Sequence, residues 1–130
     1  MSLIHYKDLA GSAAAFNSAN FVRLRPSFGE SEPADAITLR TDKSKFHSAS
    51  GMDEIVTQLQ AAISIMALTT PVGLTVWIAK SRLIDVAEAS QTLHHPNARS
   101  VLTLLVNNGP TIIQQARETV EQVVAAAGPD

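Results

Sequence analysis

Residues 37–59, which read ITLRTDKSKFHSASGMDEIVTQL, decide the fold because a later stretch of the chain repeats their pattern. Residues 102–124, which read LTLLVNNGPTIIQQARETVEQVV, run parallel to them without a gap at an offset of 65. Apolar positions agree in both strand-like and helix-like parts, and Asp53 falls on Glu118. Few residues are identical, so it is the pattern that repeats. Self-similarity at a fixed period indicates two similar supersecondary units.

The repeat extends upstream at a second offset. Phe16 falls on Ile78, and Leu24 falls on Val86, at an offset of 62. The change from 62 to 65 places three extra residues in the second copy. We expect them in the loop over residues 88–99, because surface loops tolerate insertions at little cost.

The two copies predict an α+β fold. We expect one module over residues 13–67 and another over residues 74–128, joined by an apolar linker over residues 68–73. Each module is expected to be a small antiparallel β-meander followed by one helix, with a pseudo-twofold axis relating the pair. The 130 residues are the size of one ordinary domain, so the two modules should pack together as a single domain.

Alternation of apolar and polar residues predicts the strands of the first copy. The alternating segments are residues 21–25, 36–41 and 45–48, and residues 26–35 form a loop that contains glycine and proline. In the second copy, Asn107-Asn108-Gly109 predicts a tight hairpin, because Asn-Gly supplies the positive φ angles that such turns require.

Apolar residues at spacings of three and four predict one helix at the end of each copy. The first helix is expected to begin near Ser50 as its cap, with Asp53 and Glu54 in the first turn, where the helix dipole favours negative charge. Its apolar stripe comprises Met52, Ile55, Val56, Leu59, Ile63 and Met66. The second helix carries Val120, Val123, Val124 and Ala127 and should end at Gly128-Pro129.

Composition excludes several kinds of site. With no cysteine, the chain has no disulfide, no zinc–thiolate site, no iron–sulfur cluster and no cysteine nucleophile. Ten basic and twelve acidic residues give a formal net charge of -2, which argues against a surface built as a whole for nucleic acid or anionic lipid. No secretory signal pattern is recognisable, so we expect a cytoplasmic protein.

One apolar stretch is long enough to cross a membrane. No charge occurs between Glu54 and Lys80, and residues 61–79 form a 19-residue window. Residues 69–73, TTPVG, interrupt this window, and the segments on both sides already have places in the repeat. We therefore favour an apolar linker between the modules and expect no membrane partner.

The outer sheet face of the first copy is predicted to be basic. It carries Arg23, Arg25, Arg40, Lys45 and His47. Such a face could contact phosphates, but binding of single-stranded nucleic acid also uses aromatic side chains that stack on the bases. Only Phe21 is expected to reach this face. Phe46 should point to the core, and the other aromatic residues are expected outside the paired strands. The alternatives are a nucleic-acid face and a solvated face balanced by nearby carboxylates.

The second copy differs, because both sides of residues 101–106 are largely apolar. The residues expected to face the helix are Ile84, Val86, Leu102, Leu104 and Ile113. One helix covers one face, so the other face needs cover from the other module or from another chain. We therefore expect a homo-oligomer with Leu105, Ile112 and Trp77 as interface residues, the indole being a large apolar anchor.

No catalytic, cofactor-binding or metal-binding residue is predicted. The chain has no glycine-rich nucleotide motif, no HExxH and no nucleophile elbow. His94 and His95 are adjacent, and no spaced His, Asp or Glu set completes a metal site with them, so we expect a loop there. A small-ligand or enzymatic site between the modules, near His47 and Trp77, is a third alternative.

Residues 16–24, FNSANFVRL, are followed by Ile37-Thr38-Leu39 and by the helix from Met52. This pattern resembles the small FlbD/SwrD-type flagellar proteins and similar short modules of bacteria and phages. The resemblance covers about 50 residues of each copy and rests on the spacing of strands and helix. Members of that flagellar family are single short modules, whereas this chain has two, and the resemblance assigns no functional residue.

These patterns predict a non-enzymatic, self-associating interaction or accessory protein. The alternative is a nucleic-acid-binding module that uses the basic face. Salt-sensitive binding of a single-stranded oligonucleotide that is lost in Arg23→Glu/Arg40→Glu would favour the alternative. Oligomerisation that is lost in Leu105→Asp would favour self-association.

Overall fold

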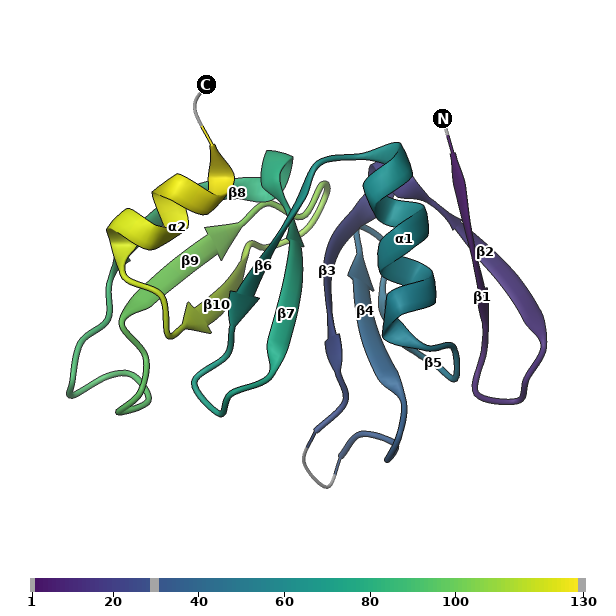
Figure 1. Ribbon diagram of the computed structural model, residues 1–130, viewed down its shortest axis with the longest axis horizontal. Coiled ribbons are helices and arrows are strands. Elements are labelled where there is room, and N and C mark those ends of the chain that lie inside the picture. Colours follow the sequence, from purple (N-terminus) through teal and green to yellow (C-terminus); the bar gives the residue numbers. More distant parts are fainter. Residues whose placement is uncertain (1, 29–30, 129–130) are drawn as a thin grey trace.

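The computed structural model describes residues 2–28 and 31–128 (Figure 1). The first half contains β1 (Leu3–Lys7), β2 (Ala13–Asn17), the 3-10 helix η1 (Ser18–Asn20), β3 (Phe21–Pro26), β4 (Ile37–Thr41), β5 (Lys45–Ser48) and α1 (Met52–Ala62). The second half contains β6 (Ile65–Thr69), β7 (Thr75–Ala79), η2 (Lys80–Arg82), β8 (Leu83–Glu88), β9 (Ser100–Leu104), β10 (Ile112–Ala116) and α2 (Val120–Ala127). The strands form three antiparallel sheets, so the predicted α+β class is confirmed.

The same order of elements occurs twice, and we call residues 3–62 module 1 and residues 65–127 module 2. From β1 to β3, every element boundary recurs in β6 to β8 at an offset of 62. The hairpin turns recur as well, since Gly11 and Gly73 have φ angles of 83° and 91°. Both glycines donate their N–H to the carbonyl three residues earlier. A shift in strand register follows the first residue of both β3 and β8.

The offset then changes twice. The pair Ile37–Ser48 of β4 and β5 corresponds to the pair Ser100–Ala116 of β9 and β10, which gives offsets of 63 and 68. One extra residue therefore lies between β8 and β9, and five lie between β9 and β10. The sequence alignment at 65, with three extra residues over 88–99, differs from this register. A gapless alignment allows only one offset, so it gave a value between 63 and 68 and did not separate the insertions in the two loops.

Module 2 begins earlier than predicted. α1 ends at Ala62, because Ile63 has extended φ and ψ angles of -144° and 168°. Met66, assigned by its spacing to the helical stripe, lies in β6. Residues 68–73 finish β6 and form its turn into β7, so they are not a linker between modules. Module 1 likewise begins with β1 and β2, which form a hairpin of their own.

The helix starts use different caps. Gly51 is the N-cap of α1, and no side chain of the described residues caps this helix. Ser50, the predicted cap, accepts the N–H of Lys7 in β1 at 2.8 Å. Thr119 caps α2 in a capping box with Gln122. α2 ends at Gly128 as predicted, with Pro129 outside the described residues. Asn108 has the positive φ expected of the turn over residues 107–109.

Pairing of β7 with β3 joins the modules. It extends the sheet of module 1 by the hairpin of module 2, in the strand order β5-β4-β3-β7-β6. Strands β8, β9 and β10 form a separate sheet, and β1 and β2 form another. A twofold axis that exchanged the modules would pair β2 with β8 wherever it paired β7 with β3. Among the described residues β2 and β8 do not pair, so this topology differs from the predicted pseudo-twofold and is head-to-tail.

Each module has its own apolar core, and each core contains one residue of the other module. The module 1 core consists of Ile4, Phe21, Leu24, Ile37, Leu39, Ile55, Val56, Leu59 and Ala79. The module 2 core consists of Val22, Met66, Leu68, Val76, Ile78, Leu102, Leu104, Val106, Ala116 and Val123. Ala79 thus packs into module 1, and Val22 packs into module 2. Units of about 60 residues are marginal alone, and this exchange adds burial to both.

Candidate functional site

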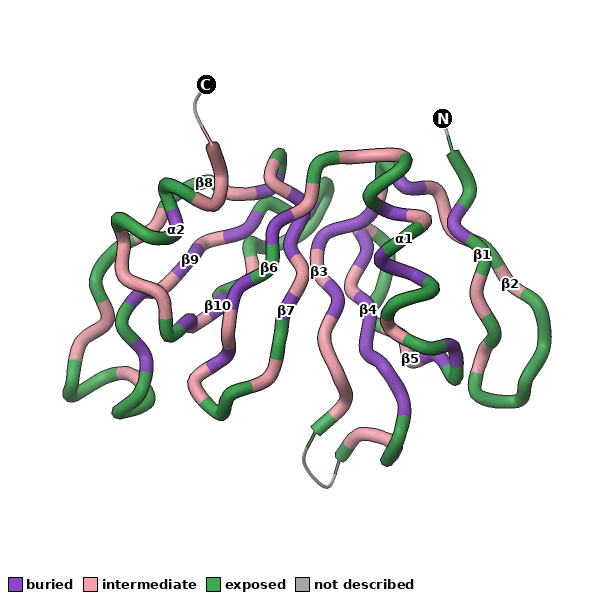
Figure 2. Tube along the Cα trace, in the orientation of Figure 1, coloured by how far each residue is buried: buried purple, intermediate pink, exposed green. Residues whose placement is uncertain are grey.

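The modules meet along β3 and β7, and we call this contact the module junction. Arg23 lies opposite Ile78, and Leu24 lies opposite Trp77. Val22 and Leu24 of β3 are fully buried, and so are Val76 and Ile78 of β7. In Figure 2 these two strands lie side by side in the middle of the molecule. The junction is therefore a continuous piece of sheet, in which Leu24 and Trp77 contribute to the module 1 core and Val22, Val76 and Ile78 contribute to the module 2 core.

The hairpin of β6 and β7 serves both cores. The side chains that pack into the module 2 core are Met66, Leu68, Val76 and Ile78. The side chains that pack against the module 1 core are Ile65, Trp77 and Ala79. Trp77, predicted as an interface residue, therefore anchors an interface within the chain.

An ion pair between Arg82 and Asp42 closes the junction. Both side chains are less than a tenth exposed, and two guanidinium nitrogens donate to the two carboxylate oxygens at 2.6 and 2.7 Å. Arg82 also donates to the carbonyl of Ala19 at 2.8 Å, and Asp42 accepts the backbone N–H of Asn107 at 2.9 Å. Burial raises the pKa of Asp42, but the hydrogen bonds from Arg82 and Asn107 outweigh it and hold the pKa below its ordinary value.

Among residues 2–28 and 31–128, no strand covers the corresponding surfaces at the two ends of the molecule. By the offset of 62, β2 corresponds to β7 and β8 corresponds to β3. Ile84 corresponds to the fully buried Val22, yet it is 51% exposed. Leu3 corresponds to the half-buried Ile65, yet it is 56% exposed. Figure 2 shows the same contrast along whole strands, since β8 and the hairpin of β1 and β2 are mostly intermediate or exposed.

We call the outer edges of β2 and β8 the free edges, because neither strand has a second sheet partner among the described residues. Other outer strands have contacts of their own. The Gln58 side chain of α1 bonds both the N–H and the carbonyl of His5 in β1 at 2.8 Å. The carboxylate of Glu118 accepts the N–H of Thr69 in β6 at 2.8 Å. The remaining outer strands, β5 and β10, occupy equivalent places in the two modules. Neither takes part in the pairing between modules, so the junction offers no template for a partner at either of them.

The three predicted interface residues do not lie together on one surface. Leu105 is 40% exposed and occupies the place of Asp42 in module 1, at an offset of 63. Ile112 is half-buried against the module 2 core. Trp77 lies in the module junction.

Two residues predicted to face the helix of module 2 face solvent instead. Ile84 lies at the register shift of β8, which displaces it from the regular alternation, and Ile113 is 54% exposed in β10. On β9, Leu102 and Leu104 are buried, whereas Val101 and Thr103 on the opposite side are half-buried. β9, predicted to be apolar on both faces, is thus fully buried on one face and half-buried on the other.

The basic residues predicted on module 1 do share one sheet face. Register places Arg23, Arg40 and Lys45 in one row and Arg25 and His47 in the next. Most of these groups are engaged within the chain. The Glu32 carboxylate accepts hydrogen bonds from both terminal nitrogens of Arg25 at 2.7 and 2.8 Å, and its Oε2 lies 3.5 Å from Lys45 Nζ.

Arg23 is turned toward module 2. It donates to the side-chain oxygen of Gln114 in β10 at 2.9 Å. Burial, together with Arg25 and Arg40, lowers its pKa to about 10, so it remains charged at neutral pH. The hydrogen bond from Arg25 is the main reason that the pKa of Glu32 falls to about 2.

The aromatic residues do not support base stacking on this face. Phe21, predicted to reach it, is 1% exposed in the module 1 core. Tyr6 and Phe16 lie in the paired strands β1 and β2, not outside them, and form an aromatic cluster with Phe46. Phe28 remains exposed beside the face, with the Arg25 guanidinium 4.6 Å from its ring centre.

The predicted ligand site near His47 and Trp77 does not form. His47 lies in register with Thr38 and Arg25, whereas Trp77 lies in register with Leu24, so the two side chains lie on opposite faces of the sheet. A pocket of about 330 Å³ does lie between the modules, but Arg23, Val72 and Ile113 are among its lining residues, not His47 or Trp77.

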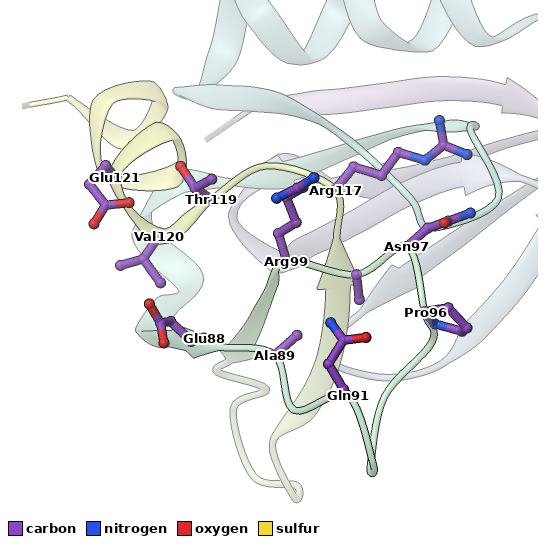
Figure 3. A pocket seen from close by; sticks show the side chains of 11 residues that line it. Glu88, Ala89, Gln91, Pro96, Asn97, Arg99, Arg117, Thr119, Val120 and Glu121 are labelled. Carbon is purple, nitrogen blue, oxygen red and sulfur yellow. The ribbon is translucent and has the colours of Figure 1, made fainter.

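A larger pocket of about 490 Å³ lies within module 2, between the loop after β8 and the start of α2 (Figure 3). Two of its polar side chains serve the fold. The Thr119 hydroxyl accepts the N–H of Gln122 in the capping box, and Arg117 donates to the carbonyl of Pro71 at 2.9 and 3.1 Å. No group of three or more potential metal ligands occurs among the described residues. The rings of His94 and His95 each accept a backbone N–H of their own loop.

Residues 61–79, long enough to span a membrane, fold as the end of α1 and the hairpin of β6 and β7. Within the described part of the chain, no helix has the length and apolar character needed to cross a bilayer. Comparison of the chain with protein-family models, curated proteins and solved structures finds no match. Functional inference therefore starts from the chain's own geometry.

Proposed function

We propose that this protein is a non-enzymatic interaction protein that associates with copies of itself. The supporting observation is the contrast between equivalent positions. Val22 is fully buried in the module 2 core, while Ile84, at the same place in module 2, is 51% exposed beside the free edge of β8. Unpaired strand edges with apolar side chains readily add another strand.

Sedimentation of the full chain over a range of concentrations tests this proposal. At tens of micromolar, the weight-average mass should exceed the 13.9 kDa of one chain and should rise with concentration. Ile84→Lys should return the mass to that of the monomer, because association would bury an unpaired charge. Ile113→Lys is the matched control: Ile113 has similar exposure, and its counterpart in module 1 is already Lys45. A monomeric wild-type chain would contradict the proposal.

Nucleic-acid binding remains the second candidate because, within the described part of the chain, Arg23 and Arg40 have no carboxylate partner among their hydrogen bonds. It predicts binding of a single-stranded oligonucleotide that weakens steeply with salt and is lost in Arg40→Glu. Binding that is absent at low salt would eliminate this candidate. The sedimentation result does not depend on it.

A further inference from the structure

We infer that a second copy of the chain binds by strand addition, with the outer edge of β2 in one copy pairing antiparallel with the outer edge of β8 in the next. This inference rests on the proposed function and specifies the contact through which association would occur. Its template is the module junction, where β7 adds to β3 in the same way. Strand addition of this kind supplies main-chain hydrogen bonds, and neighbouring side chains supply specificity.

The template also fixes the register. At the junction, Arg23 lies opposite Ile78 and Leu24 lies opposite Trp77. Adding 62 to the residue numbers of β3 gives β8, and subtracting 62 from those of β7 gives β2. The residue pairs of the junction therefore predict the pairs between copies. Asp85 then lies opposite Phe16 of the next copy, and Val86 lies opposite Ala15 of the next copy. A shift of one residue would turn every side chain to the wrong face, so this register is specific.

The exposed apolar residues fit this arrangement. Val22 packs from module 1 into the module 2 core, so Ile84 would pack into the module 1 core of the next copy. Ile65 and Trp77 cover the module 1 core, so Leu3 and Ala15 would cover the module 2 core of the preceding copy. Both exposed residues, Ile84 and Leu3, would therefore become buried in one contact.

The contact would be weaker than the module junction. The places of Arg82 and Asp42 are taken by Asn20 and Leu105, so the ion pair of the junction has no counterpart between copies. Ala15 is also much smaller than Trp77. Reversible association is the expected result.

The contact is heterologous, because it joins two different edges of identical chains. A copy bound through its β2 keeps its β8 edge free, and these elements belong to modules at opposite ends of the molecule (Figure 1). Repetition therefore builds a ring if the rotation closes and an extending chain if it does not.

Disulfide trapping between two single-cysteine variants tests the register, and the absence of native cysteine makes the result unambiguous. Ala15→Cys and Val86→Cys, mixed and oxidised, should form a mixed dimer, because residues directly opposite in an antiparallel pair are close enough for a disulfide. Ala13→Cys is the matched control, since it is exposed on the same strand two residues away. It should react with Val86→Cys several-fold less.

Ala14→Cys with Ala87→Cys, the next pair of the same register, provides a second trap if Val86→Cys folds poorly. Cross-linking of Val86→Cys with itself would overturn the inference in favour of a symmetric contact between two β8 edges. Failure of both traps, while the wild-type mass still exceeds that of a monomer, would overturn the register and leave self-association standing. A monomeric wild type would overturn both.

Discussion

The module junction and the two ends of the molecule present equivalent strands, but only the junction has both strands in place. Within the chain, β7 pairs with β3 and Val22 is fully buried in the module 2 core, whereas Ile84 at the corresponding place on β8 is half exposed. The junction also has the ion pair of Arg82 with Asp42, and the equivalent positions in the opposite modules hold the uncharged Asn20 and Leu105. If the proposed self-association is correct, the same kind of strand edge serves twice, permanently within the chain and reversibly between chains.

Breaking the ion pair should have the largest effect on the junction. Arg82→Ala leaves Asp42 with its counter-ion removed in a nearly buried place, and the free energy of unfolding should fall by about 3 kcal/mol. Urea denaturation at neutral pH measures this loss. Arg99→Ala, which removes an exposed arginine, is the control and should change the value by less than about 0.5 kcal/mol. Equal effects of the two substitutions would argue against the junction pair.

Removal of the junction's aromatic anchor should have a smaller effect. Trp77 is half-buried, so Trp77→Ala should cost about 2 kcal/mol of unfolding free energy, below the range for a fully buried aromatic residue. At the corresponding place on β2, the converse change Ala15→Trp should strengthen association in sedimentation experiments. An unchanged association constant for Ala15→Trp would mean that β2 does not occupy the place that β7 occupies.

Transfer of the ion pair to the positions of Asn20 and Leu105 should have the smallest effect. Leu105→Asp alone should weaken association, and adding Asn20→Arg should restore it, because the two positions then carry the charges of Asp42 and Arg82. The Leu105 carbonyl accepts a hydrogen bond from Arg82 and the Asn20 carbonyl accepts the N–H of Asp42, so an unchanged free energy of unfolding of each variant serves as the control that the existing pair is intact. The coupling free energy in a double-mutant cycle should be about 1 kcal/mol. A cycle in which the two changes are additive would remove Asn20 and Leu105 from the contact.

Local patterns were sufficient for the strands and helices that alternate or repeat clearly. β3, β4 and β5 lie within a residue or two of their predicted bounds, and α2 ends at Gly128 as predicted. β6 was missed because Ile63 and Met66 continue the spacing of α1, and no glycine or proline separates them from it. β2 was missed because residues 13–15 are all alanine, which is uncommon in strands.

The repeat was detectable, but its register was not. Loops of different length change the offset from 62 to 63 and then to 68, and a gapless comparison returns an intermediate value. The free edges could not be predicted for a related reason. Pairing of β7 with β3 joins residues 53 to 55 positions apart, and only that pairing distinguishes the covered Val22 from the exposed Ile84.

Complementation between two edge variants tests the head-to-tail account most directly. Ile84→Lys disables the β8 edge, and Ala15→Lys disables the β2 edge, so each variant alone should sediment as a monomer. Their mixture retains one intact pair of edges and should form a dimer of twice 13.9 kDa and nothing larger. A dimer formed by Ala15→Lys alone, or a mixture that stays monomeric while the wild type associates, would contradict the account.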